Sequence, residues 1–147
     1  PDFAARYGLR PETRSLAGVP LIRIDVPTSD PDWVDWDGWS ARTGVPLENT
    51  NAEGAAVPQV ALSGSGLRLA RSGIGLVLGG LSEVLHAVAE GTLVMPLGRG
   101  SVVPARYWHR LIWLKERRLG PEQRAVRDWI AEHAGADRAR MRALFGV

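Results

Sequence analysis

The residues with the clearest chemical potential lie in the stretch ALSGSGLRLARSGIGLVLGG, residues 61–80. Glycines before a helix can cradle a phosphate, because their backbone N–H groups and the helix dipole face the anion. Here Gly64 and Gly66 come before or at the start of a predicted helix, but the next glycine is Gly73, and no Lys-Ser or Lys-Thr pair follows. This spacing argues against a nucleotide site. Ser63 and Ser65 remain, and their hydroxyl groups could cap the helix or bind a ligand carboxylate or hydroxyl.

The other reactive side chains show no arrangement typical of an enzyme. The three histidines lack metal-ligand spacing, and the absence of cysteine excludes disulfides, thiolate metal sites and cysteine nucleophiles. Four aspartates between residues 30 and 37 crowd the start of a predicted helix, where the helix dipole stabilises carboxylates. Nothing singles out a catalytic pair among them. We therefore expect no enzyme activity, no cofactor and no metal, with an enzyme fragment that uses these carboxylates as a weaker alternative.

Length and composition indicate a globular protein. The chain has 147 residues, of which 45% are hydrophobic and 23% charged, which is enough for one ordinary domain or two small subdomains. The net charge is +2, but residues 99–147 contain 11 basic and 5 acidic residues. Because the acidic residues interrupt the basic ones, this pattern favours a solvated helix face over a nucleic-acid surface.

The hydropathy of the chain and its first residues predict where the protein is located in the cell and whether the chain is a part of a longer protein. No apolar run approaches the ~20 residues of a membrane span, and no basic-then-apolar leader is present, so we expect a cytoplasmic protein with no membrane partner. The chain begins with Pro1 rather than Met. We therefore expect a longer protein whose beginning is missing here.

Periodicity along the chain predicts alternating helices and strands. Apolar residues alternate over 19–26, as in a strand that ends before Pro27. The further expected elements are helical turns at 3–8 and 11–17, helices at 64–72 and 81–91, and strands at 45–51, around 57–60, 74–79 and 92–97. This alternation with short loops predicts an α/β fold, with a mixed, mostly parallel sheet flanked by helices.

The segment TSDPDWVDWDGWSARTG, residues 28–44, predicts another helix. Ser29 or Asp30 could serve as its N-cap, Pro31 as its first helical residue and Gly44 as its stop. The acidic residues of its first turn complement the helix dipole.

Three tryptophans recur within this segment. Trp33, Trp36 and Trp39 are three residues apart, so they would share one side of the helix. Such a stripe could stack on a sugar or a base, but the polar residues on the opposite face favour packing onto the sheet. We expect the tryptophans to lie in the core.

The chain changes character after Gly98. Residues 105–114, ARYWHRLIWL, are expected to be extended, followed by a helix from Pro121 to about His133 and a helical tail to Leu144. One strand and one or two helices cannot close a core alone. This segment is therefore expected to pack on chain not present here, or on a second copy of the protein.

The order of several strings resembles the C-terminal part of LysR-type transcriptional regulators, nearest to the glycine-cleavage-activator and AmpR-like branch. The matching strings are RYGLRPETRSLAGVPLIRID, DWVDWDGW, ALSGSGLRLARSGIGLVL, EGTLVMPLG and AVRDWIAEHA, spread over residues 1–134. The family joins a DNA-binding winged helix-turn-helix to an effector-binding region of two subdomains that are similar to periplasmic binding proteins.

The resemblance implies a domain plan. Residues 1–100 would form the second effector-binding subdomain, and residues 101–147 would supply the hinge return strand and C-terminal helices of the first. DNA would be bound only through the absent N-terminal domain, and the regulator would be a homo-oligomer. A small-molecule effector would lie in the cleft between the subdomains.

The resemblance also implies where the effector binds. Ser63, Gly64 and Ser65 match a loop of the family that faces the cleft, and two pairs, Thr28 with Ser29 and His109 with Arg110, match further cleft positions. Arg110 replaces a residue that is usually aromatic, and an arginine there could bind an anionic effector or could simply lie on the surface of an edge strand. The alternative function is a stand-alone solute-binding domain of a transport system.

Overall fold

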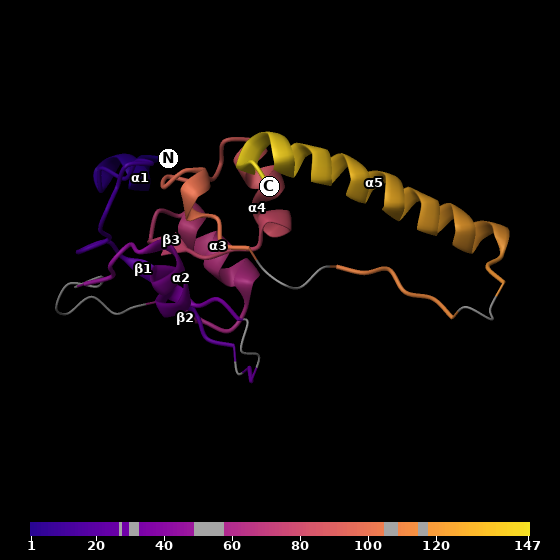
Figure 1. The fold of residues 1–147 in the computed structure, drawn as a ribbon, viewed down its shortest axis with the longest axis horizontal. Coiled ribbons are helices and arrows are strands. Elements are labelled where there is room, and N and C mark those ends of the chain that lie inside the picture. Colours follow the sequence, from indigo (N-terminus) through magenta and orange to yellow (C-terminus); the bar gives the residue numbers. More distant parts are fainter. Residues whose placement is uncertain (27, 30–32, 49–57, 105–108, 115–117) are drawn as a thin grey trace. The chain divides into compact units, whose positions relative to one another are not determined.

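The computed structural model describes residues 1–26, 28–29, 33–48, 58–104, 109–114 and 118–147 (Figure 1). The chain divides into two compact units, residues 1–104 and 105–147. The assignment of 1–100 and 101–147 to two subdomains of a larger effector-binding region stays a prediction.

The first unit is built on a parallel sheet. Its strands are β1 (Leu21–Ile24), β2 (Gln59–Val60) and β3 (Leu76–Val77), in the order β2-β1-β3. Both pairs are parallel, with Arg23 opposite Gln59 and Leu21 opposite Leu76. The predicted α/β class is confirmed by this sheet and its helices. The antiparallel member of the expected mixed sheet is not among the described strands.

Helix α3 (Ser63–Arg71) covers one face of the sheet, between β2 and β3 in the chain. Gly66 is the closest point of approach: a Cβ there would lie 3.0 Å from Cγ2 of Val77, 3.5 Å from Cγ1 of Ile24 and 3.6 Å from Cγ2 of Val60. Because these three neighbours come from the three strands, the missing side chain at Gly66 lets α3 lie directly on the whole sheet.

Helix α2 (Trp36–Thr43) lies over the other face. Side chains alternate along β1, so Leu21 and Arg23 point away from α3, where Arg23 pairs with Asp37 of α2 at 3.6 Å. Trp36 and Trp39 are only 4% and 3% exposed and belong to the main core cluster with Leu21. The expected core role of these two tryptophans is confirmed.

Each buried indole is also held by a hydrogen bond. Nε1 of Trp36 donates to the carbonyl oxygen of Ile22 at 2.9 Å, and Nε1 of Trp39 donates to that of Ser101 at 2.9 Å. The two rings meet edge to face, with their centroids 5.5 Å apart. Both polar atoms are therefore satisfied without loss of apolar packing.

The predicted start of this helix was wrong. The N-cap is Asp35, whose carboxylate accepts a hydrogen bond from the backbone N–H of Gly38 at 2.8 Å. Trp33 precedes the helix and is 43% exposed, so it is not part of the core stripe. Several aspartates in this segment could cap a helix, and the register that buries Trp36 and Trp39 selects Asp35. Of the predicted start residues, Asp30 and Pro31 lie outside the described residues.

Helix α4 (Leu81–Ala89) follows β3, and helix α1 (Asp2–Arg6) opens the chain. Both match predicted helices. Residues 11–17 form turns rather than a helix, residues 45–48 are not a strand, and 49–51 lie outside the described residues.

The predicted strand at 92–97 was also wrong. The N–H of Leu93 and the hydroxyl of Thr92 both donate to the carbonyl oxygen of Ala87, at 3.0 and 3.1 Å, so the chain wraps around the end of α4. Pro96 lacks an N–H to offer a neighbouring strand. A short 3₁₀ helix, η1 (Arg99–Ser101), follows.

The second unit consists of one long helix and the segment before it. Helix α5 (Pro121–Phe145) begins with Pro121 at its first turn, ends at Gly146 and is continuous, so no break separates the predicted helix from its tail. Residues 109–114 form no regular element, and 105–108 lie outside the described residues. No helix in the described part of the chain is long and apolar enough to cross a membrane.

Candidate ligand-binding site

The sheet brings three chain segments to one edge. Since the strands are parallel, their carboxyl ends, Ile24, Val60 and Val77, lie on the same side. The chain then continues to α2 after β1 and to α3 after β2, and these helices cover opposite faces. Segments that leave a parallel sheet in opposite directions open a crevice, which is where open α/β sheets bind ligands.

The first turn of α3 lies at this edge and carries Ser63, Gly64 and Ser65. Oγ of Ser63 donates a hydrogen bond to Oε1 of Glu83 in α4, at 2.9 Å. Oγ of Ser65 accepts one from Nη2 of Arg68, at 3.0 Å. The N-cap of α3 is Leu62 and no side chain caps the helix, so the capping interpretation of the two serines was wrong.

These two hydrogen bonds give the serines opposite preferences toward a ligand. Because Ser63 donates its proton to Glu83, its oxygen is left to accept from an N–H or O–H group. Ser65 already accepts from Arg68, so its O–H is left to donate. The turn therefore suits a ligand that presents a donor to Ser63 and an acceptor to Ser65.

Sequence reasoning missed Glu83 and Arg68. Oε2 of Glu83 also accepts, at 3.4 Å, from the backbone N–H of Gly80, the residue before α4. The spacing of three residues between Gly80 and Glu83 is that of a capping box, of which this hydrogen bond is one half. Ser65 and Arg68 are also three residues apart, which makes them neighbours on the surface of a helix. Both signals were present in the sequence, but neither indicates which side chain the serine would meet.

The remaining predicted ligand residues are exposed. Thr28 and Ser29 lie in the segment that follows the carboxyl end of β1, consistent in chain position with the crevice. His109 and Arg110 belong to the second unit and lie outside any helix or strand. Their participation in the same site therefore stays a prediction, as does the alternative that Arg110 is a surface residue.

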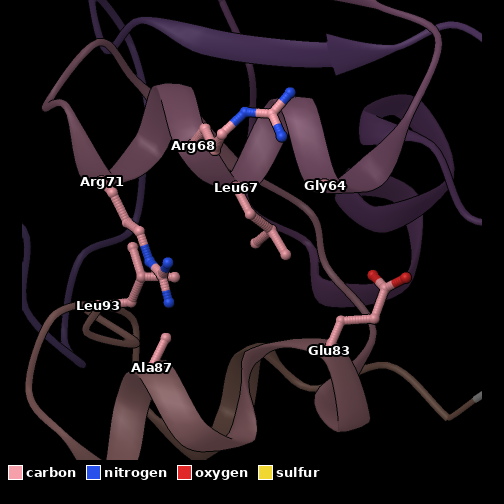
Figure 2. Close-up of a pocket in the computed structure, with 7 residues that line it drawn as sticks. All are labelled: Gly64, Leu67, Arg68, Arg71, Glu83, Ala87 and Leu93. Atoms are coloured by element: carbon pink, nitrogen blue, oxygen red, sulfur yellow. The ribbon is translucent and has the colours of Figure 1, made fainter.

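A groove of about 340 Å³ runs between α3 and α4 and reaches this turn at Gly64 (Figure 2). Three apolar side chains and three charged ones line it together with Gly64: Leu67, Ala87, Leu93, Arg68, Arg71 and Glu83. Glu83 points toward Gly64, and Arg71 extends across from α3 toward Ala87 and Leu93, while Arg68 points away. No group of three metal-ligating side chains occurs within the part of the chain that is described.

The family model of the LysR substrate binding domain matches residues 1–135. The chain belongs to the LysR substrate-binding domain family. No curated protein and no solved structure gives a significant match. The expected LysR family is thus confirmed, and with it the class of protein: effector-binding domains of transcription regulators, with a periplasmic-binding-protein-like α/β fold.

The match ends at residue 135, inside α5, and the helix continues to Phe145. The parallel sheet with helices on both of its faces is consistent with the α/β fold of this family.

Proposed function

We propose that this domain senses a small effector for a bacterial LysR-type regulator of the glycine-cleavage-activator and AmpR-like branch. The effector binds in a cleft whose wall, on residues 1–100, is the carboxyl edge of the β2-β1-β3 sheet. Residues 101–147 belong to the first subdomain. The whole regulator acts in the cytoplasm as a homo-oligomer and contacts DNA through its N-terminal domain.

The observation that supports this proposal best is the serine turn of α3. It lies directly after β2, at the edge where α/β sheets bind ligands, and both serines retain a free hydrogen-bonding capacity toward that edge. Arg68 beside Ser65 favours a carboxylate at that position, and Glu83 beside Ser63 favours a hydroxyl or an ammonium group. Hydroxy acids and amino acids carry both kinds of group.

The function needs no covalent chemistry. A ligand that contacts both subdomains binds their closed arrangement better than their open one, so it shifts the population toward the closed state. The size of the shift is limited by the difference between the two affinities, with a factor of about 10⁴ needed to reverse a 1:99 ratio. In the full regulator that change repositions the DNA-binding domains.

Thermal shift measurements on the chain test the proposal. A panel of small hydroxy acids, amino acids and dicarboxylic acids is screened, and a compound present at 100 times its Kd should stabilise the fold by about 2.7 kcal/mol. Ser65→Ala should reduce the shift given by a hit, because it removes the O–H donor.

Ser72→Ala is the matched control, since Ser72 lies just after the same helix and donates to the carbonyl oxygen of Arg68 at 3.2 Å, away from the edge. The proposal fails if every hit retains its full shift in Ser65→Ala, or if Ser72→Ala lowers the shifts equally.

A further inference from the structure

The groove between α3 and α4 has an apolar floor, and two of its three charged residues lie at its ends, while the third, Arg68, points away. Leu67 points into its centre, and Ala87 and Leu93 form the opposite wall (Figure 2). Glu83 lies at the end near Gly64, and Arg71 lies at the other end. All of these residues belong to the first unit, and apart from Gly64 none is among the predicted effector contacts.

Neither of the two charges is neutralised by the described protein. Glu83 is held by two donors, the Ser63 hydroxyl and the Gly80 N–H, and neither donor is a cation. The side chain of Arg71 forms no ion pair or hydrogen bond with any described residue. The carboxylate of Glu83 and the guanidinium of Arg71 are therefore both available to pair with charged groups of a ligand, and apolar surface lies between them.

The geometry of α3 sets the spacing of the two backbone positions near which the charges are held. Glu83 bonds to Ser63, and the backbone of Arg71 lies eight residues after that of Ser63 along α3, an offset of about 12 Å at 1.5 Å per residue. A dipeptide spans at most about 7 Å. Hydrogen bonds of about 3 Å at each end extend its reach to about 13 Å, which matches the offset. A single α-amino acid, whose charges share one carbon, is too short.

We propose that this groove is a second ligand site that binds a small zwitterion with an apolar middle, of the size of a dipeptide. The ammonium group of the ligand binds Glu83, its carboxylate binds Arg71, and its apolar side chains lie on Leu67, Ala87 and Leu93. The volume of about 340 Å³ is within the range of small-molecule sites. The groove lies on the flank of α3 rather than at the sheet edge, and it shares with the proposed effector site the residue Glu83, whose carboxylate accepts the hydrogen bond from Ser63.

Titration of the ¹⁵N-labelled chain with leucyl-leucine, followed by amide NMR, tests the proposal. We expect saturable shifts at the amides of Leu67, Ala87 and Leu93. N-acetyl-leucyl-leucine lacks the ammonium group, leucyl-leucine amide lacks the carboxylate and leucine lacks the length, so each should bind about tenfold more weakly, the effect of losing one charge-assisted contact. These comparisons use the unaltered protein and do not depend on any variant folding.

Two substitutions check the assignment of the charges. Glu83→Gln should weaken the binding of leucyl-leucine about tenfold, and this variant should then bind leucyl-leucine no more tightly than N-acetyl-leucyl-leucine. Arg71→Gln should also weaken leucyl-leucine about tenfold, and this variant should bind it no more tightly than leucyl-leucine amide. Arg42→Gln is the matched control, because Arg42 is exposed in the last turn of α2.

Each other outcome overturns the proposal. Absence of saturable shifts for leucyl-leucine up to its solubility limit means that the groove binds no such ligand. Equal binding of the capped peptides means that the charges do not select it. Shifts confined to residues 25–29 and 61–65 would place the peptide at the sheet edge, which would leave the proposed effector site standing and remove this one.

Discussion

The contact between Gly66 and the sheet gives the sharpest test of the fold. In Gly66→Ala two effects oppose each other. Alanine stabilises a helix relative to glycine by about 0.5–1 kcal/mol. Its Cβ, however, would lie 3.0 Å from Cγ2 of Val77, a distance at which the valine or the helix must move.

The steric cost should exceed the gain. Overpacking a core commonly costs about 1–3 kcal/mol. The neighbours on all three strands leave α3 no direction along the sheet in which to escape, so we expect Gly66→Ala to lower the free energy of unfolding by about 1 kcal/mol. Gly64→Ala is the matched control: it lies two residues earlier in the same helix with nothing within 4 Å, and should be neutral or stabilise by up to about 0.5 kcal/mol.

Urea unfolding of the three proteins, followed by tryptophan fluorescence, measures this difference, since Trp36 and Trp39 become exposed when the core unfolds. The reasoning is refuted if Gly66→Ala is as stable as Gly64→Ala. That result would mean that Val77 gives way at little cost, or that α3 lies farther from the sheet at Gly66.

Three further substitutions, the first with a control, test other parts of the first unit, all by the same unfolding measurement. Asp35→Ala removes the N-cap of α2 and should cost about 1 kcal/mol. Asp37→Ala should cost less, because Asp37 is exposed where it pairs with the half-buried Arg23; equal costs would contradict the observed helix start. Trp36→Phe removes the hydrogen bond to Ile22 and leaves its buried carbonyl oxygen without that donor, for an expected loss of about 1–3 kcal/mol; an unchanged stability would mean that water replaces the indole. Gly44→Ala has open space around it but a φ of +71°, so it should destabilise by about 1 kcal/mol through the backbone alone, and no loss would show that the helix can end in another conformation.

Much of the first unit could be predicted because local rules and packing agree there. The alternation of β1 identifies its two faces, and the glycines at 44 and 73 lie at positive φ next to the ends of α2 and α3. The start of α2 could not be predicted, because several residues before it are competent caps and only burial of Trp36 and Trp39 chooses between them. The segment 92–97 has the composition of a strand, but its hydrogen bonds go to the end of α4.

The candidate site also contains residues that could be predicted from the sequence and residues that could not. The serines of α3 could be found from the chain alone, because they follow a strand and begin a helix. Their partners could not, since Ser63 meets Glu83 from a helix 20 residues away in sequence. That contact depends on how closely α3 and α4 approach, and so does the groove between them. Gly79 permits this approach: a Cβ there would lie 3.0 Å from Cγ1 of Val84 and 3.3 Å from Cδ2 of Leu67.

The Ser63–Glu83 hydrogen bond has a consequence for both proposed sites, because it joins a residue of the sheet edge to a residue of the groove. Holding one flexible carboxylate in place before a ligand arrives is worth about 0.5–1.5 kcal/mol. Ser63→Ala should therefore weaken leucyl-leucine by a factor of about two to ten, although Ser63 does not line the groove, and Ser72→Ala should leave it unchanged. An effector that engages Ser63 must change the affinity for the peptide by the same factor by which the peptide changes the affinity for the effector. If Ser63→Ala binds leucyl-leucine as the unaltered chain does, Glu83 is held without the serine, and the two sites are independent.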